Sequence, residues 1–309
     1  MHITCLDDLI TACAGLPEMP RVAVVNPVDG FVLRAAVESM QRNVAIPVFV
    51  GDLTTAKAKA KDIGLDIDGF QFYDEPDTGN ALRFALRLYR QGEVGLMMKG
   101  LVPTADLLKA VLDKETGAPP QGVLSHVALF ERPMTHQLMI LTDAGVNIRP
   151  NLQRKVDIVK NAVTVMRAIG VSRPKIAFLA ATEKVNYPAM PATLDADLLT
   201  KMAEHGEFGE VDAAGPMALD IAVSHEAAQI KGITNSVAGS ADILVVPAIE
   251  SGNVLYKSLN SFNKVPIAGI VAGSAVPLVV PSRGDSEATK LHSLALAACL
   301  TKPETLQAL

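Results

Sequence analysis

The chain has 309 residues, of which 49% are hydrophobic and 20% charged, and its formal net charge is −5. This composition is typical of a folded globular protein and excludes a disordered chain. The negative charge argues against a general binder of nucleic acid or of acidic membrane surfaces. The length predicts two packed domains rather than one small core.

The cysteines indicate a reducing compartment. Cys5, Cys13 and Cys299 are widely separated and contain no C-x-x-C pair. This pattern excludes a disulfide scaffold and a thiolate zinc site, and the histidines show no ligand-like spacing, so we predict no metal site. Neither a signal peptide nor a membrane-spanning run is evident. We therefore expect a cytoplasmic protein without membrane association.

Short apolar runs alternate with helical patterns along the chain. We predict strands at residues 21–27, 46–51, 94–100, 175–181, 243–249 and 265–273, and helices at residues 30–42, 79–91, 104–114, 152–169 and 194–204. Alternation of helices with nearly continuous apolar strands predicts an α/β fold with a mostly parallel sheet. Residues 123–131 and 136–143, joined by a short link, predict one antiparallel hairpin.

Turn residues at 143–150 predict a domain boundary directly after the hairpin. A final helix at 287–300 is too apolar to stand alone, so we expect it to pack on the first domain. The predicted domains are therefore a discontinuous first domain, residues 1–147 with 283–309, and a second domain, residues 148–282. Clefts between α/β domains are common ligand sites, and we expect the ligand in such an interdomain cleft.

The strongest chemical signal is the junction between an apolar strand and the final helix. Ser282, Arg283, Asp285 and Ser286 supply two hydroxyls, a cation and a carboxylate at this junction. A helix N-terminus offers free N–H groups and a positive dipole end, and an arginine can grip a phosphate or carboxylate with two hydrogen bonds. The junction therefore predicts a site for an anionic ligand.

A second cation lies at the end of the predicted strand 94–100. Lysine is expensive to bury, so the head group of Lys99 must emerge at the strand end beside Gly100. The residues alone leave two readings equal, a snorkelling lysine at a turn and a phosphate contact. We expect Thr104 to cap the next helix, and Lys109 taken alone reads as a solvated surface charge.

Two later segments carry neutral hydrogen-bond donors. Asn235 and Ser236 lie in a polar, glycine-rich loop before a predicted strand. Gly252 and Asn253 follow that strand, and we expect them to present N–H groups at a helix start, with Lys257 on the helix face. Each segment alone fits a plain loop or an ordinary helix face. Two anion-competent junctions in one chain favour a binding site.

Segments 96–112, 122–147, 231–259 and 279–297 together resemble the phosphate acetyltransferase/phosphate butyryltransferase family. The runs LMMKGLVPTADLLKAVL and GVLSHVALFE look like the butyryl branch, and ADILVVP followed by ESGNVLYK is a family-wide pattern. With the strand at 47–51, the matching segments span nearly the whole chain. The resemblance implies two α/β/α domains of the isocitrate/isopropylmalate dehydrogenase-like fold, an active site in the cleft and usually a homodimer.

Such enzymes exchange coenzyme A and inorganic phosphate on an acyl group, so that acyl-CoA and phosphate give acyl phosphate and CoA. The resemblance implies that these substrates suffice without a further cofactor. It implies that Ser282 hydrogen-bonds the developing oxyanion and that Arg283 binds phosphate. We predict Ser282, Arg283 and Asp285 as the catalytic residues, Asp285 being the nearest carboxylate and a candidate to orient Arg283. The expected substrate contacts are Lys99, Gly100, Thr104, Lys109, Asn235, Ser236, Gly252, Asn253, Lys257 and Ser286.

The chain departs from the acetyl branch at two positions. Thr289 stands where that branch carries its proposed aspartate base, and Lys109 aligns approximately with an arginine. A phosphate acetyltransferase and a non-catalytic acyl-CoA-binding protein therefore stay open as alternatives to a butyryl-type enzyme. A metal-dependent oxidoreductase on the same fold would need clustered aspartates, which the matching segments lack.

Overall fold

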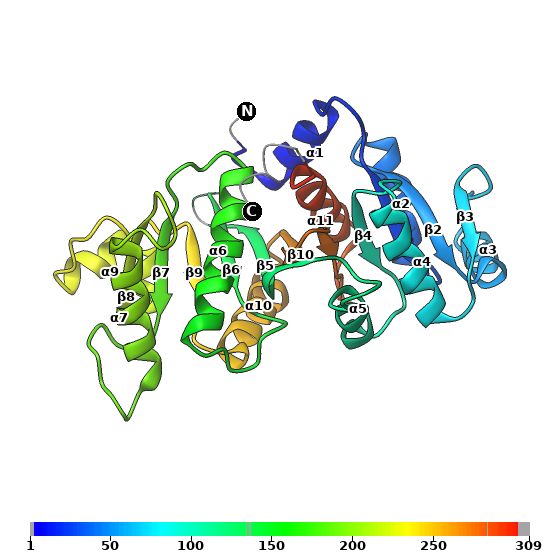
Figure 1. Ribbon diagram of the computed structural model, residues 1–309. Coiled ribbons are helices and arrows are strands. Elements are labelled where there is room, and N and C mark those ends of the chain that lie inside the picture. Colours follow the sequence, from blue (N-terminus) through cyan, green and yellow to red (C-terminus); the bar gives the residue numbers. More distant parts are fainter. Residues whose placement is uncertain (1–2, 134, 136, 283, 302–309) are drawn as a thin grey trace. The chain divides into compact units, whose positions relative to one another are not determined.

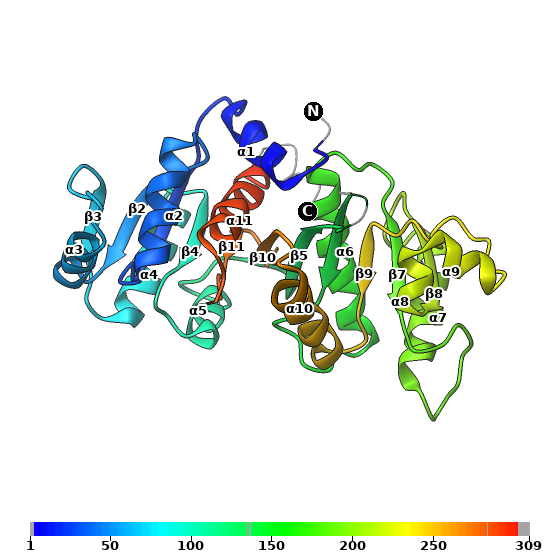
Figure 2. The ribbon, with the colours of Figure 1, turned by 180° about the vertical axis from the view of Figure 1, so that it is seen from behind.

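The computed structural model describes residues 3–133, 135, 137–282 and 284–301. The chain divides into two compact units. The amino-terminal unit consists of Cys5–Gly122 and Pro266–Leu309, and the central unit consists of Val123–Val265 with the first four residues. Figures 1 and 2 show the elements of each unit from two sides.

The amino-terminal unit is built on a sheet with the strand order β3-β2-β1-β4-β11-β10. Its strands are β1 (Arg21–Val25), β2 (Ile46–Gly51), β3 (Gln71–Asp74), β4 (Leu96–Lys99), β10 (Ile267–Ser274) and β11 (Leu278–Val279). Neighbouring strands are parallel except β10 and β11, which are antiparallel. β1, β2 and β4 are nearly continuous buried apolar runs, as expected for parallel strands covered on both faces.

Six helices flank this sheet among the described residues. They are α1 (Leu6–Ala14), α2 (Gly30–Gln41), α3 (Leu53–Asp62), α4 (Thr78–Arg90), α5 (Thr104–Val111) and α11 (Glu287–Cys299). The carboxylates of Asp29, Asp52 and Asp77 accept hydrogen bonds from the first turns of α2, α3 and α4, so side-chain caps fix where these helices begin. α11 packs on β10, α2 and α1, and Figure 2 shows it beside β11.

The central unit has the strand order β5-β6-β9-β7-β8. Its elements are β5 (Pro120–Glu131), β6 (Leu138–Thr142), α6 (Leu152–Ala168), β7 (Lys175–Leu179), α7 (Pro191–Glu204), β8 (Asp212–Met217), α8 (Leu219–Val223), α9 (His225–Ile230), β9 (Ile243–Val245) and α10 (Ile249–Asn263). β5 and β6 form an antiparallel hairpin, and the other neighbours are parallel. Across the described parts of both units, no helix combines the length and apolar character needed to cross a membrane.

The predicted α/β fold with mostly parallel strands and one early hairpin is confirmed. The compact units, however, divide the chain at 122/123 and 265/266 rather than at 147/148 and 282/283. The hairpin groups with the central unit because β6 pairs with β9. β10 and β11 group with the amino-terminal unit because β11 pairs with β4. The sequence boundaries were drawn at turns, whereas strand pairing decides which segments share a core.

Candidate active site

Three neighbouring strands of the amino-terminal unit end at one edge of their sheet. β1, β4 and β11 are parallel neighbours, so the residues at their carboxyl ends meet there. Asp29 follows β1, Lys99 ends β4 and Ser282 follows β11. They line a cavity of about 350 Å³, the Ser282 pocket. Its other lining residues are Val32, Gly100, Leu101, Val102, Pro103, Pro281 and Lys290.

Ser282 is carried on a turn that closes on itself. Its backbone N–H donates to Asp285 Oδ2 at 2.7 Å, and the N–H of Asp285 donates to the carbonyl oxygen of Ser282 at 3.1 Å. Asp285 is only 8% exposed, so its carboxylate acts here as a clamp on the turn. Ser286 caps α11, because its Oγ accepts the N–H of Thr289 at 3.1 Å. Arg283 lies outside the described residues, and its predicted role stays a prediction.

Gly100 lies where the end of β4 comes close to the loop after β1. Its N–H donates to the carbonyl oxygen of Val25 at 2.8 Å. A Cβ at this position would lie 2.2 Å from the carbonyl oxygen of Asn26, so only glycine fits. Lys99 reaches the end of its strand as predicted, where its Nζ donates to the carbonyl oxygen of Val102 at 2.9 Å. The glycine at position 100 therefore allows the two backbone segments to approach each other beside Lys99.

Lys290 is a lining residue that the sequence analysis missed. It lies in the first turn of α11 and is 2% exposed. Burial lowers the pKa of its ammonium, and the carboxylates of Asp285, Asp29 and Glu287 oppose that shift. One signal could have found it, because it is the only lysine, arginine or carboxylate between residues 288 and 301. A lone lysine in an apolar helix indicates a charge that the fold needs inside.

Three predicted contacts of this unit, Thr104, Lys109 and Ser286, do not line the Ser282 pocket. Thr104 and Lys109 are exposed on α5. The predicted helix cap at Thr104 is wrong, because the helix already begins at Thr104 and Pro103 occupies the cap position. Pro103 does line the pocket, so the loop before α5 contributes rather than the helix itself.

In the central unit, Gly252 and Asn253 pack against the loop after β6. The N–H of Gly252 donates to the carbonyl oxygen of Ala248 at 3.2 Å, so the expectation that it is presented at a helix start is wrong. A Cβ on Gly252 would lie 2.6 Å from the carbonyl oxygen of Asp143, which explains the glycine. Asn253 Nδ2 donates to the carbonyl oxygen of Ala144 at 3.2 Å. Lys257 is exposed, with its Nζ 5.4 Å from the ring centre of Tyr256.

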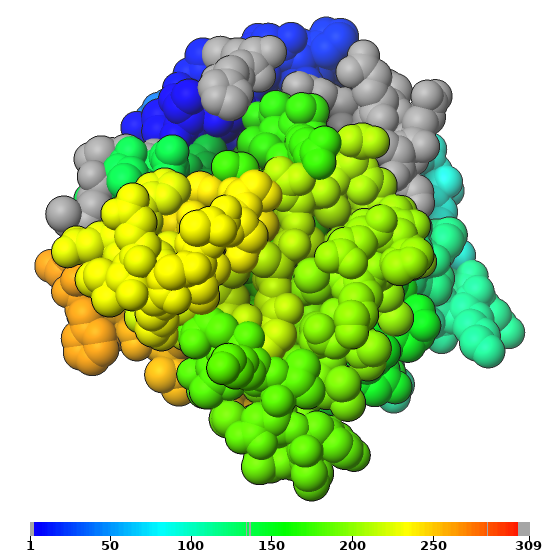
Figure 3. Space-filling view, turned by 90° about the vertical axis from the view of Figure 1, so that its left-hand side faces the viewer, coloured from blue at the N-terminus to red at the C-terminus, as the bar shows by residue number. Residues whose placement is uncertain are grey.

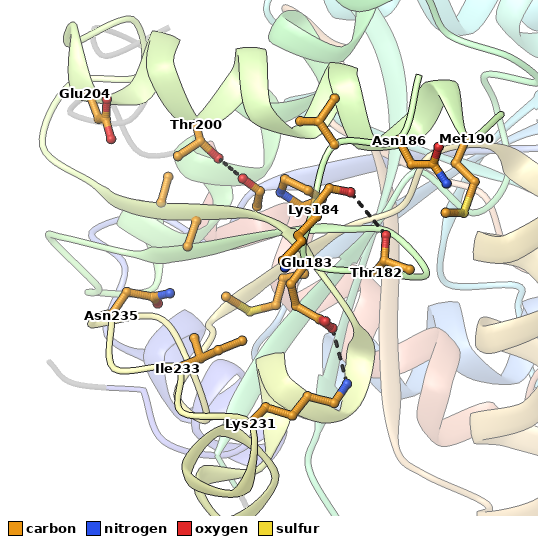
Figure 4. A pocket seen from close by; sticks show the side chains of 16 residues that line it. Thr182, Glu183, Lys184, Asn186, Met190, Thr200, Glu204, Lys231, Ile233 and Asn235 are labelled. Atoms are coloured by element: carbon orange, nitrogen blue, oxygen red, sulfur yellow. Dashed lines mark hydrogen bonds and ion pairs between the residues drawn. The ribbon is translucent and has the colours of Figure 1, made fainter. Parts of the chain in front are cut away.

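The central unit also holds a larger cavity of about 1010 Å³ beside β8, here the β8 pocket. Figure 3 shows this face hollowed between the yellow segment around α9 and the yellow-green α7. In Figure 4, Lys231 points at Glu183, and the two head groups are 3.3 Å apart. Asn235 lines this pocket, but its Oδ1 already accepts the N–H groups of Val237 and Ala238. Ser236 is exposed and does not line it.

The remaining lining residues of the β8 pocket come from four segments, namely residues 182–190, α7, β8 and the loop after α9. They are Thr182, Lys184, Val185, Asn186, Met190, Thr200, Glu204, Ala213, Ala214, Gly215, Pro216, Met217 and Ile233. Thr200 Oγ1 donates to the carbonyl oxygen of Gly215 at 3.1 Å, and Thr182 Oγ1 donates to that of Lys184 at 3.2 Å. Its hydroxyls therefore serve the fold. In the part of the chain that the structure describes, no group of three histidine, cysteine or carboxylate side chains is placed to hold a metal ion.

Comparison with known proteins identifies the family. A family model described as Phosphate acetyl/butaryl transferase matches residues 76–298. The chain is 43% identical to the phosphate butyryltransferase of Clostridium acetobutylicum over 281 residues, which cover 91% of this chain and 93% of that protein. A branched-chain phosphotransacylase from Enterococcus faecalis V583 has a crystal structure that matches with a TM-score of 0.81 and 33% identity, covering 92% of this chain and 99% of that one. The chain belongs to the phosphate acetyl/butyryl transferase family.

The fold is shared more widely. The crystal structure of a 4-hydroxythreonine-4-phosphate dehydrogenase from Burkholderia phymatum matches with a TM-score of 0.55 at 12% identity, covering 92% of this chain and 98% of that one. At this identity the likeness concerns the fold alone. The predicted relation to the isocitrate/isopropylmalate dehydrogenase-like fold is confirmed, as is the predicted family.

Proposed function

We propose that this chain is a phosphate acyltransferase of the butyryl type, which converts a short-chain acyl-CoA and phosphate into acyl phosphate and CoA. Family membership supports the reaction class. The observation that carries the proposal is the Ser282 pocket, which joins a clamped serine to two lysines. Lys99 and Lys290 outnumber Asp29 among its charged lining residues, so the pocket favours an anion although the whole chain is negative.

The chemistry divides between substrate and protein. A phosphate oxygen attacks the thioester carbonyl carbon, and the carbonyl oxygen becomes an oxyanion. The Ser282 hydroxyl donates a hydrogen bond to that oxyanion, which stabilises the transition state more than the ground state. The C–S bond then breaks, the carbonyl reforms, and the CoA thiolate leaves and takes a proton from water. Asp285 contributes by holding the Ser282 backbone, so the hydroxyl is oriented before the substrates arrive.

Thr289 does not prevent this direction of reaction. Phosphate is already ionised at neutral pH, so its attack on acyl-CoA needs no protein base. The reverse direction starts from a thiol with a pKa of about 8.5, which is only slightly ionised at neutral pH. Thr289 itself belongs to the helix cap, because its N–H donates to Ser286 Oγ. We therefore propose that a missing carboxylate base limits the CoA-acylating direction most.

A thiol-release assay tests the proposal. Purified protein is mixed with acetyl-, propionyl-, butyryl- or branched-chain acyl-CoA, and free thiol is followed with and without phosphate. We expect release that depends on phosphate and is fastest with a four-carbon or branched chain. Fastest release with acetyl-CoA would assign the acetyl alternative, which the family description also covers. Binding of CoA with no release from any thioester would instead favour the non-catalytic acyl-CoA-binding protein.

Several finer predictions accompany this function. The interdomain cleft, the homodimer, the cytoplasmic location and the absence of a further cofactor stay predictions. The same holds for the roles of Arg283 and of the predicted contacts Thr104, Lys109, Asn235, Ser236, Gly252, Asn253, Lys257 and Ser286. Among the predicted contacts, Lys99 and Gly100 line the Ser282 pocket, so we propose these two first as substrate contacts.

A further inference from the structure

Lys290 is a buried lysine that forms no direct ion pair among the described residues. Lys290 is 2% exposed, and its side chain is among the largest fully buried side chains of the described residues. Its Nζ donates to the carbonyl oxygen of Asp285 and lies 5.4 Å from the ring centre of Phe31. Both contacts are favourable, but neither partner carries a formal negative charge. A buried ammonium without a direct ion pair is disfavoured, so an anionic ligand that reaches it would stabilise its charged form.

No carboxylate comes within ion-pair distance. Across the described residues, the ion pairs closer than 4.0 Å involve other lysines, arginines and a histidine, but not Lys290. Of the three neighbouring carboxylates, Glu287 lies 3.7 Å from Arg34, and the other two accept backbone N–H groups. Asp29 Oδ1 accepts the N–H of Val32 at 3.0 Å, and Asp285 Oδ2 accepts that of Ser282. The ammonium therefore lines the cavity without a direct ion pair, and only the more distant carboxylates of Asp285, Asp29 and Glu287 favour its charged form.

The hydrogen-bond donors of the Lys290 ammonium also favour a ligand in the cavity. An ammonium carries three N–H donors, and the carbonyl oxygen of Asp285 uses one of them. The others are available to a ligand in the cavity that Lys290 lines with Ser282 and Lys99. A tetrahedral phosphate offers several oxygens to the lysines that line this cavity. A thioester group carries no formal charge and does not compensate the buried ammonium.

We propose that Lys290 is a phosphate-binding residue of this site, whose ammonium contacts the phosphate that attacks acyl-CoA or leaves from the acyl phosphate. This assignment rests on the proposed function. The same side chain fixes the turn that carries Ser282, since it holds the carbonyl oxygen of Asp285. The Lys290 ammonium would thus position both the phosphate and the turn of Ser282. This would fix the distance between the attacking phosphate oxygen and the hydroxyl that stabilises the oxyanion.

Steady-state kinetics of Lys290→Met and Lys290→Arg test the proposal, with Lys61→Met as the matched control on the exposed face of α3. Because a charged hydrogen bond to phosphate is lost, we expect Lys290→Met to raise the phosphate KM about tenfold to hundredfold. Its acyl-CoA KM should stay within about twofold, since the thioester does not use this group. Lys290→Arg keeps the charge and should recover most of the phosphate affinity. Lys61→Met should match the wild type.

Each outcome decides the question. A wild type without phosphate-dependent thiol release removes the proposed function, and the inference with it. A working wild type with an unchanged phosphate KM in Lys290→Met overturns the inference alone. An equal loss for both substrates, or loss of folding in both Lys290→Met and Lys290→Gln, shows a purely structural role. Calorimetric titration with inorganic phosphate alone should show binding by the wild type that is weaker in Lys290→Met, and equal binding contradicts the proposal.

Discussion

The β8 pocket and the Ser282 pocket differ in volume and in how the lysine on their walls is paired, and the smaller pocket holds the lysine without an ion pair. The β8 pocket, at about 1010 Å³, is the larger, yet Lys231 on its wall has carboxylate oxygens of Glu183 and Asp220 at 3.3 and 3.8 Å. The Ser282 pocket, at about 350 Å³, holds Lys290 with no carboxylate at such distances among the described residues. Volume alone would select the first. The buried lysine without an ion pair indicates that the Ser282 pocket is the candidate active site.

Exposure explains why the two lysines are not equivalent. The side chain of Lys231 is 43% exposed, so water solvates its charge and the neighbouring carboxylates add little. Lys290 is 2% exposed, so its charge is poorly solvated and any anion that reaches it is bound more strongly. The comparison teaches that a site is marked by what the fold leaves unsatisfied.

The largest effect is expected from the hydroxyl of Ser282. Ser282→Ala removes the donor for the oxyanion, and kcat should fall about a hundredfold to a thousandfold, as for other single oxyanion donors. The matched change in the β8 pocket is Thr182→Ala, whose hydroxyl donates to the carbonyl oxygen of Lys184, and kcat should stay within about twofold. Phosphate-dependent thiol release measures both. Equal losses in the two variants would remove the distinction between the pockets.

A second effect concerns the glycines that allow close backbone approach in each pocket. A Cβ at Gly100 would lie 2.2 Å from the carbonyl oxygen of Asn26, and one at Gly215 would lie 2.6 Å from the Cβ of Phe178. Both Gly→Ala variants should lose about 1–3 kcal/mol or more of unfolding free energy by overpacking. Only Gly100→Ala should also lower the activity of the folded protein, because it shifts the loop that lines the Ser282 pocket.

Denaturant unfolding and the kinetics of the folded fraction separate these two outcomes. Gly95→Ala is the control, since its Cβ would make ordinary contacts with the Thr301 side chain at 3.4 Å and with the Cβ of Pro20 at 4.0 Å. Its stability should change by less than about 1 kcal/mol. If Gly100→Ala is destabilised but keeps the wild-type kcat and KM, the close backbone approach at Gly100 has no role in substrate positioning.

Much of this architecture was predictable from the sequence, and the reasons are local. The alternation of apolar runs with helical patterns placed β1, β2 and α2 to within two residues, because strand and helix periods differ clearly there. The hairpin followed from a short polar link between two apolar runs. The short α8 and α9 and the edge strands β3 and β8 were missed, since their half-buried patterns carry no distinct period.

The candidate site was predictable only in part. Ser282, Lys99 and Gly100 follow apolar strands, and strand ends are where polar side chains meet in a parallel sheet. Lys290 escaped because its importance lies in burial and in the absence of a nearby carboxylate, which depend on how α11 packs against α2 and β10. The substrate contacts predicted for Gly252 and Asn253 stay predictions, but their packing on Asp143 and Ala144 depends on tertiary contacts that the sequence does not show.

A third prediction uses the pH dependence of stability. Burial lowers the pKa of folded Lys290, whereas the unfolded lysine titrates near its ordinary value of about 10.4. Between these two values the unfolded chain binds more protons, so this group makes the folded state gain stability as pH rises. Below both values the penalty is fully present. Lys290→Met should therefore raise Tm near pH 7 in phosphate-free buffer, by an amount that shrinks toward about pH 10.

Thermal unfolding at several pH values, with Lys61→Met as the exposed-lysine control, measures this effect. Added phosphate should raise the Tm of the wild type more than that of Lys290→Met, because it supplies the missing counter-charge. A Tm difference between wild type and Lys290→Met that is independent of pH would show that the buried ammonium is not penalised. The Ser282 pocket would then be as well balanced as the β8 pocket.

The smallest effect is expected from the ion pair of the β8 pocket. Lys231 and Glu183 are 3.3 Å apart with side chains 43% and 29% exposed, so water screens their attraction. A double-mutant cycle of Lys231→Gln and Glu183→Gln should give a coupling below about 1 kcal/mol, falling further in high salt. The phosphate KM of both variants should equal that of the wild type, because a paired, solvated lysine has no charge to spare. A raised phosphate KM in Lys231→Gln would place an anion in the larger cavity and reverse the assignment of the two pockets.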